Sequence, residues 1–292
     1  MFISNPFAKF APYFVNMKRI VFSTLITLLF LSSCGSYNKV LVSRDYDNRY
    51  ETAKAYYAEG HYRRAANLLV DMITTLKGTD KAQESLFMLA MCEYNDGDNE
   101  TASTYFRQFY GSYPKGDLSE LARYYSGVAL YRATPDPRLD QSATTGAIAE
   151  LQTFMEFYPN SQWRPRAQIM VDELRDKLVE KEYLAAKLYY NLGSYFGNCT
   201  SGGNNFQACI TTVQNTLKDY PYSKLREELY ILNLRAKYEL AKQSVSEKTE
   251  ERFRDAIDEY YGFKNEFPES KYLKEADRMF ANASKNISSE EE

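Results

Sequence analysis

A repeat with a period of 37 residues constrains the fold of this chain more than any other feature. Three series of residues keep this spacing near the start, one of small residues and two of aromatic residues: Ala53, Ala90 and Gly127; Tyr50, Phe87 and Tyr124; Tyr57, Tyr94 and Tyr131. Within each unit, the small residue precedes the second aromatic residue by one helical turn, and the two aromatic residues share a helix face. This half of each unit is therefore predicted to be a helix.

The other half of each unit has a spacing of its own. A small residue lies 12 positions before a proline in four units, and an aromatic residue precedes each proline: Ala102 and Pro114, Ala147 and Pro159, Cys209 and Pro221, Ala256 and Pro268. Proline ends a helix because it has no amide proton and its ring clashes with the preceding turn. Ser161, Ser223 and Ser270 follow three of these prolines and are good candidates for N-caps of the next helix.

This pattern resembles the tetratricopeptide repeat, in which small residues let two antiparallel helices approach each other. The resemblance implies an all-α fold, an α-solenoid of about five helix pairs with a C-terminal capping helix. With only 13 Gly and 9 Pro in 292 residues, few turns are expected. The expected units are 46–79, 80–115, 117–160, 163–222 and 223–269, followed by the capping helix over 271–285.

Residues 166–192 contain neither glycine nor proline and are predicted to form one long helix. We expect this helix to separate three N-terminal repeats (49–162) from a C-terminal part (163–287) that holds the long connecting helix, repeats four and five and the cap. An insertion at 195–205 interrupts the fourth repeat. The acidic tail, 288–292, is predicted to be disordered.

The N-terminal region reads as a bacterial lipoprotein signal. Lys18 and Arg19 precede an apolar run of about 12 residues, which is too short to span a membrane but is typical of a signal peptide. Leu31-Ser32-Ser33-Cys34 then resembles the lipobox, whose cysteine is lipidated on sulfur and becomes the mature N-terminus. We expect a signal peptide over 1–33, with Met17 as an alternative start, a lipidated Cys34 and a polar tether over 34–48. A secretory signal with a chance cysteine is the alternative.

The composition argues against an enzyme and against a nucleic-acid partner. The single histidine, His61, lies in an expected turn, and most metal sites and catalytic triads would have to rest on it alone. With 36 basic and 39 acidic residues, the chain has no basic surplus to bind phosphates. No nucleotide-binding loop or nucleophile motif is present. We therefore expect a binding protein without catalytic residues, metal or cofactor.

The recurring aromatic positions indicate a ligand-binding face. In a solenoid of this kind the first helix of each pair lines the concave side, which suits an extended or helical peptide. The candidate groove residues are Tyr50, Lys54, Tyr57, Phe87, Met91, Tyr94, Tyr124 and Tyr131. The alternative is that these rings pack between repeats and contact no ligand.

Cys199 and Cys209 form a candidate disulfide, because the compartment beyond the inner membrane is oxidising. The bond would attach the glycine-rich insertion to the following helix. Cys209 also occupies the small-residue position of Ala102 and Ala147, which explains it without a bond. Both interpretations remain open.

A lipobox followed by about five repeats with aromatic-Pro-x-Ser junctions resembles the BamD family of outer-membrane assembly lipoproteins. The most specific parts are Leu31 to Cys34 and the junctions Tyr158 to Ser161 and Phe267 to Ser270. The resemblance implies a lipid-anchored protein on the periplasmic face of the outer membrane. It also implies docking on a BamA-like insertase with other assembly-complex subunits, and recognition of unfolded β-barrel substrates by the N-terminal repeats.

A different class of function remains as the alternative. A repeat-based lipoprotein could instead capture glycans or peptides, or act as a scaffold for peptidoglycan enzymes. The partners recovered from membranes would separate this class from an assembly factor.

Overall fold

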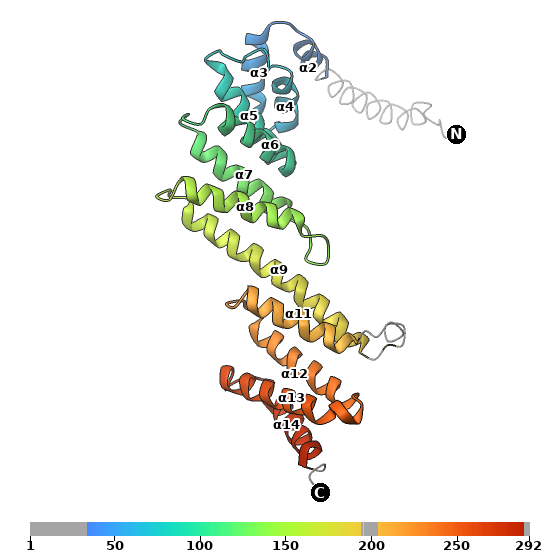
Figure 1. Cartoon of the computed structure of the whole chain (residues 1–292). Helices are drawn as coiled ribbons and strands as arrows, with labels where there is room; N and C mark the ends of the chain where they lie inside the picture. Colours follow the sequence, from blue (N-terminus) through green and yellow to red (C-terminus); the bar gives the residue numbers. More distant parts are fainter. Residues whose placement is uncertain (1–33, 194, 196–203, 289–292) are drawn as a thin grey trace, which may run out of the picture. The chain divides into compact units, whose positions relative to one another are not determined.

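The computed structural model describes residues 34–193, 195 and 204–288, and every regular element in these ranges is an α-helix (Figure 1). The predicted all-α class is confirmed. The helices are α2 (Cys34–Leu41), α3 (Tyr46–Ala58), α4 (Tyr62–Val70), α5 (Lys81–Asp96), α6 (Asn99–Ser112), α7 (Ser119–Ala133), α8 (Ser142–Phe157), α9 (Arg164–Leu192), α11 (Asn205–Asp219), α12 (Arg226–Lys242), α13 (Ser246–Glu266) and α14 (Leu273–Ser288).

Helices that follow one another in the chain pack against each other, as the repeat pattern predicts. The main packed pairs are α3 with α4, α4 with α5, α5 with α6, α8 with α9, α9 with α11, α11 with α12, α12 with α13 and α13 with α14. The chain divides into two compact units between Ala122 and Arg123, within α7. The expected division at 162/163 lies further along the chain, inside the second unit, because α9 packs on α8 as well as on α11.

The aromatic–proline junctions end their helices as predicted. Tyr113, Tyr158, Tyr220 and Phe267 are the C-caps of α6, α8, α11 and α13, and each backbone amide donates to the carbonyl four residues earlier. The serines after the prolines act differently from the N-caps we expected. The hydroxyl oxygens of Ser161, Ser223 and Ser270 accept from the amide two residues on, at 3.0–3.1 Å, and the next helix begins one residue after that amide.

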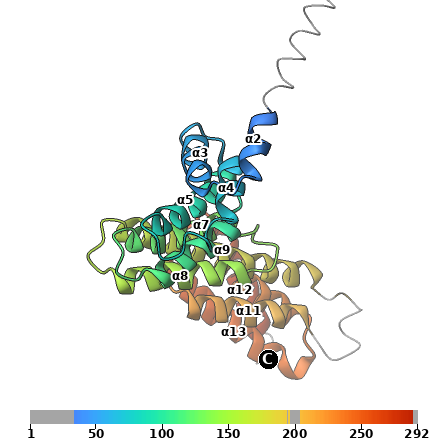
Figure 2. The same cartoon turned by 90° about the horizontal axis from the view of Figure 1, so that it is seen from above.

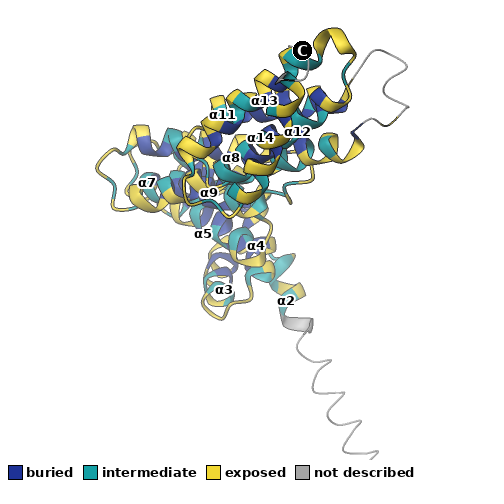
Figure 3. Cartoon of the chain, turned by 90° about the horizontal axis from the view of Figure 1, so that it is seen from below, coloured by how far each residue is buried: buried dark blue, intermediate teal, exposed yellow. Residues whose placement is uncertain are grey.

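Small residues lie where neighbouring helices come closest. Ala53, Ala90, Ala102, Ala147 and Cys209 are fully buried, which is the role that the repeat spacing assigns to them. A Cβ atom built on Gly127 would lie 2.6 Å from a side-chain carbon of Leu151, so α7 and α8 pack in direct contact at this point. The buried residues follow one side of each helix, which Figure 3 shows in dark blue.

The long helix is confirmed, and α9 contains 29 residues, about 44 Å at 1.5 Å per residue. It ends at Gly193, whose φ of 50° favours glycine. Most of the predicted insertion, 196–203, lies outside the described residues, as do the signal peptide and the acidic tail after Ser288. Among the helices that the structure describes, none combines the length and the apolar composition needed to cross a bilayer.

The segment expected to be a polar tether is largely helical. Cys34–Leu41 forms α2, and α3 already begins at Tyr46. Tyr37, Val40 and Leu41 pack against the core that α3 and α4 build, and Figure 2 shows α2 beside these helices. The expected tether was wrong for this segment, because the three apolar side chains recur at helical spacing and bury one face of it.

Candidate binding surfaces on the first helices

Tyr50, the first of the candidate groove residues, is a core residue between α3 and α5. Only 2% of its surface is exposed, and its hydroxyl donates to Glu84 Oε2 at 2.5 Å. The Nζ atoms of Lys54 and Lys81 lie 5.2 and 5.0 Å from its ring centroid. Burial and the carboxylate of Glu84 raise the pKa of Tyr50 well above its usual value. Tyr50 therefore supports a layer of charged side chains.

This charged layer consists of two ion pairs. Lys54 Nζ lies 3.1 Å from Glu84 Oε1, and Lys81 Nζ lies 2.7 Å from Asp47 Oδ1. All four side chains are at least partly exposed. Exposed ion pairs contribute only about 0–1 kcal/mol to stability. A negatively charged ligand that binds these lysines can therefore replace their carboxylate partners at low cost.

The other candidate residues of the first unit are half-buried. The ring of Tyr57 packs edge-on against Tyr62, with centroids 5.7 Å apart, and Phe87 packs edge-on against the two buried rings of Phe106 and Phe109. Met91 and Tyr94 lie half-buried on α5. Tyr57, Met91 and Tyr94 thus combine an apolar contact surface with partial exposure, which suits a binding face.

The candidate residues of α7 divide in the same way. Tyr124 is 3% exposed and stacks on Trp163, with centroids 5.1 Å apart and an interplanar angle of 22°. Tyr131 is half-buried, and its hydroxyl donates to Glu173 Oε2 at 2.5 Å, a contact that raises the pKa of Tyr131. Tyr50 and Tyr124 thus pack between helices, the alternative set out above, while the second aromatic position reaches the surface.

The sequence carries one further set of these positions that our reading missed. Tyr183, Ala186 and Tyr190 on α9 repeat the spacing of Tyr50, Ala53 and Tyr57. Ala186 is fully buried, and both tyrosines pack against the core between α9, α11 and α12. The local spacing of these three residues is visible in the sequence. Because α9 is longer than the other first helices, however, the three residues do not continue the 37-residue period.

A bidentate ion pair joins α12 to α14 in the second unit. Arg235 Nε and Nη2 each donate to a Glu275 oxygen at 2.7 Å, and the guanidinium carbon lies 5.2 Å from the ring centroid of Tyr272. The two charge-assisted hydrogen bonds lower the pKa of Glu275. The pair therefore attaches the capping helix through both charge and stacking.

This pair gives a pH-dependent prediction. Since the pKa of Glu275 is lower in the folded state, the pair stabilises the fold above the unfolded value of about 4.3, and the contribution is lost as the pH falls through the folded value. A double-mutant cycle with Arg235→Gln and Glu275→Gln should give a coupling free energy of about 1 kcal/mol at pH 7 and a smaller coupling free energy at about pH 3.5. Urea unfolding at both pH values measures it. A coupling unchanged at low pH would contradict the assignment.

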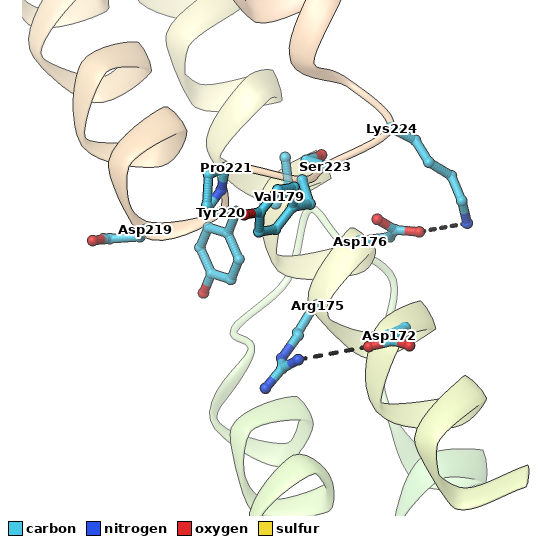
Figure 4. A pocket seen from close by; sticks show the side chains of 10 residues that line it. Asp172, Arg175, Asp176, Val179, Asp219, Tyr220, Pro221, Ser223 and Lys224 are labelled. Carbon is cyan, nitrogen blue, oxygen red and sulfur yellow. Dashed lines mark hydrogen bonds and ion pairs between the residues drawn. The ribbon is translucent and has the colours of Figure 1, made fainter. Parts of the chain in front are cut away.

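A pocket of about 660 Å³ lies between α9 and the turn from α11 to α12 (Figure 4). The lining includes Tyr220, Pro221 and Tyr222, and Tyr222 is 97% exposed. Lys224 Nζ lies 2.6 Å from Asp176 Oδ2 at its edge, and a second pocket, of about 500 Å³, shares this ion pair. An exposed aromatic ring beside charged side chains is a composition that protein interfaces favour at their energetic centres.

The remaining candidate residues are placed only in part. Cys209 is fully buried in the small-residue position, and burial raises the pKa of its thiol to about 12. Cys199 lies outside the described residues, so its bond to Cys209 stays a prediction. Cys34 begins α2, but the lipobox residues before it lie outside the described part, and its lipidation stays a prediction too. His61 is exposed and precedes α4, as expected of a turn residue.

The chain is similar to outer-membrane proteins. A family model described as YfiO, outer membrane lipoprotein, matches residues 43–200. The outer membrane protein assembly factor BamD of Caulobacter vibrioides is 22% identical over 167 residues, which cover 57% of this chain and 53% of that protein. An Aquifex aeolicus protein provisionally named as a BamD is 25% identical, and the match covers 60% of this chain and 58% of that protein. The BamD of Pasteurella multocida is 20% identical, and the match covers 74% of this chain and 84% of that protein.

The matched region spans little more than half the length of the first two relatives. Among solved structures, a Podospora anserina kinesin light chain protein with TPR-like repeats aligns with 77% of this chain at 12% identity, but its TM-score of 0.34 is too low to carry an argument. The family match itself covers more than half of the chain and includes α3 to α9. The chain therefore belongs to the YfiO family of outer membrane lipoproteins.

Proposed function

We propose that this protein is a non-catalytic, lipid-anchored subunit of the β-barrel assembly machinery on the periplasmic face of the outer membrane. It docks on a BamA-like insertase and helps to recognise and insert outer-membrane β-barrel proteins. The observation that carries the proposal is the family match over residues 43–200, supported by relatives named as assembly factors. The paired helices and their half-exposed aromatic residues support a binding role.

The first unit offers a surface of suitable chemistry for the substrate. Tyr57, Met91 and Tyr94 provide partly exposed apolar contacts, and Lys54 and Lys81 provide cations whose carboxylate partners, Glu84 and Asp47, are exposed. A peptide that ends in an aromatic residue presents both a ring and a terminal carboxylate. We propose that its ring contacts the aromatic residues and its carboxylate replaces Glu84 or Asp47 as the partner of a lysine.

Replacement of both Tyr57 and Tyr94 by alanine tests this surface. We expect a synthetic peptide with a C-terminal phenylalanine to bind at least about tenfold more weakly, because two aromatic contacts are lost. Fluorescence anisotropy measures the binding, and circular dichroism checks the helices. Tyr261→Ala, which removes an exposed ring on α13, is the matched control and should bind normally. Loss of helical structure in the double variant would instead assign both rings to the core.

The second unit offers a surface for the insertase at the pocket beside Tyr222. Replacement of Tyr222 by serine should lower the amount of BamA-like protein recovered with this subunit by about tenfold, because exposed tyrosines are frequent hot spots. Quantitative pull-down from detergent-solubilised membranes measures the recovery. Tyr261→Ser serves as the control. Equal recovery with both variants would place the contact elsewhere on the chain.

A further inference from the structure

Helix α2 connects the expected lipid site directly to the first repeat. It begins at Cys34 and continues to Leu41, and only a short turn separates it from α3. A helix of eight residues is about 12 Å long, whereas the same eight residues in a fully extended chain would reach about 28 Å. An anchor on Cys34 would therefore stay close to the folded body.

The inner face of α2 is fixed to the body by several contacts. The ring of Tyr37 packs edge-on against Tyr56 at 5.7 Å, and the guanidinium of Arg64 lies 5.8 Å from the Tyr37 ring and 5.7 Å from the Tyr56 ring. Val40 and Leu41 pack against the buried core of α3 and α4. Arg64 thus lies near both rings, and α2 is part of the first compact unit rather than a separate arm.

The exposed side chains of α2 and of the turn after it form a different set. Asn38, Lys39 and Val42 are exposed, and Val42 has 79% of its surface in solvent. Residues 34–44 contain two basic residues, Lys39 and the exposed Arg44, and no acidic residue; the first carboxylate, Asp45, caps α3. An exposed apolar side chain between two cations is suited to the headgroup region of an anionic bilayer.

We infer that α2 and the turn after it form a membrane-contacting strut, whose exposed residues Lys39, Val42 and Arg44 lie on anionic phospholipid headgroups and hold the first repeat against the bilayer. The inference rests on the lipidation of Cys34 in the proposed function. The acyl chains supply the attachment, and the strut sets the distance between the bilayer and the repeats. The first unit is then held near the surface instead of moving at the end of a flexible tether.

Bromolipid quenching of an added tryptophan tests the strut. The full-length lipidated protein is reconstituted into vesicles of phosphatidylethanolamine and brominated phosphatidylglycerol, with Trp163 as a constant background. The indole of the Val42→Trp variant should lose fluorescence in these vesicles. Val245→Trp is the matched control, since Val245 is also an exposed valine, and its indole should keep its fluorescence. Adding Lys39→Glu and Arg44→Glu to Val42→Trp should abolish the loss while the protein still floats with the vesicles.

The outcomes separate the strut from the proposed function. Protein that floats with the vesicles but shows no quenching of Val42→Trp would overturn the strut and leave the lipid anchor in place. Quenching that survives the two charge reversals would overturn the role of the anionic headgroups. Protein that does not float would overturn both the anchor and the strut.

Discussion

Replacement of Cys34 by serine is expected to move the protein almost completely from the membrane fraction to the soluble fraction. Each buried acyl CH₂ contributes roughly 0.8 kcal/mol, so loss of several chains removes nearly all of the direct membrane affinity. Cell fractionation followed by an alkaline wash measures the change, because the wash also removes protein held only by partners.

Cys92 provides the control for this experiment. It is a buried free thiol on α5, so Cys92→Ala removes a cysteine without touching the expected anchor. This variant should stay in the membrane fraction. A Cys34→Ser protein that also stays there after the wash would contradict the lipid anchor.

Replacement of Gly127 by valine is expected to destabilise the second unit strongly. A Cβ atom at this position would lie 2.6 Å from Leu151 Cδ2 and 2.9 Å from its Cγ, and Leu151 is fully buried. Overpacking of this kind costs about 1–3 kcal/mol, and the two extra methyl groups of valine place the cost at the upper end. The free energy of unfolding in urea measures it.

Gly146 on α8 is the matched control for this substitution. It is a helical glycine with no heavy atom within 4 Å of an added Cβ. Gly146→Val should change the free energy of unfolding by less than about 0.5 kcal/mol, because valine has a better helix propensity than glycine. Equal effects at the two glycines would show that α7 and α8 are not in close contact at Gly127.

Much of the fold could be predicted because the residues that end each helix act through their own backbone. An aromatic residue before proline ends a helix through its own backbone and the missing amide of the proline, and Tyr158 and Tyr220 do so in the structure. The long helix α9 could be predicted equally well, because residues 166–192 contain no glycine or proline. These features need no knowledge of how distant segments pack.

The candidate site was harder to predict because burial depends on the neighbouring helix. Tyr50 and Tyr57 share a face of α3, yet the side chains of α5 cover Tyr50 and leave Tyr57 half-exposed. Spacing alone does not separate such residues. The helix α2 was missed for another reason, since the polar composition of the segment outweighed the apolar stripe of Tyr37, Val40 and Leu41.

The partner recovered from membranes tests the central proposal most directly. The tagged wild-type protein, extracted in mild detergent and purified through its C-terminus, should bring down a BamA-like insertase in near-equal amount, identified by mass spectrometry. The same recovery should fall when Tyr222 is replaced by serine and should persist with Tyr261→Ser. Recovery with only a transporter barrel, or with peptidoglycan enzymes and no insertase, would contradict the assignment to β-barrel assembly and favour a ligand-capturing or scaffold lipoprotein.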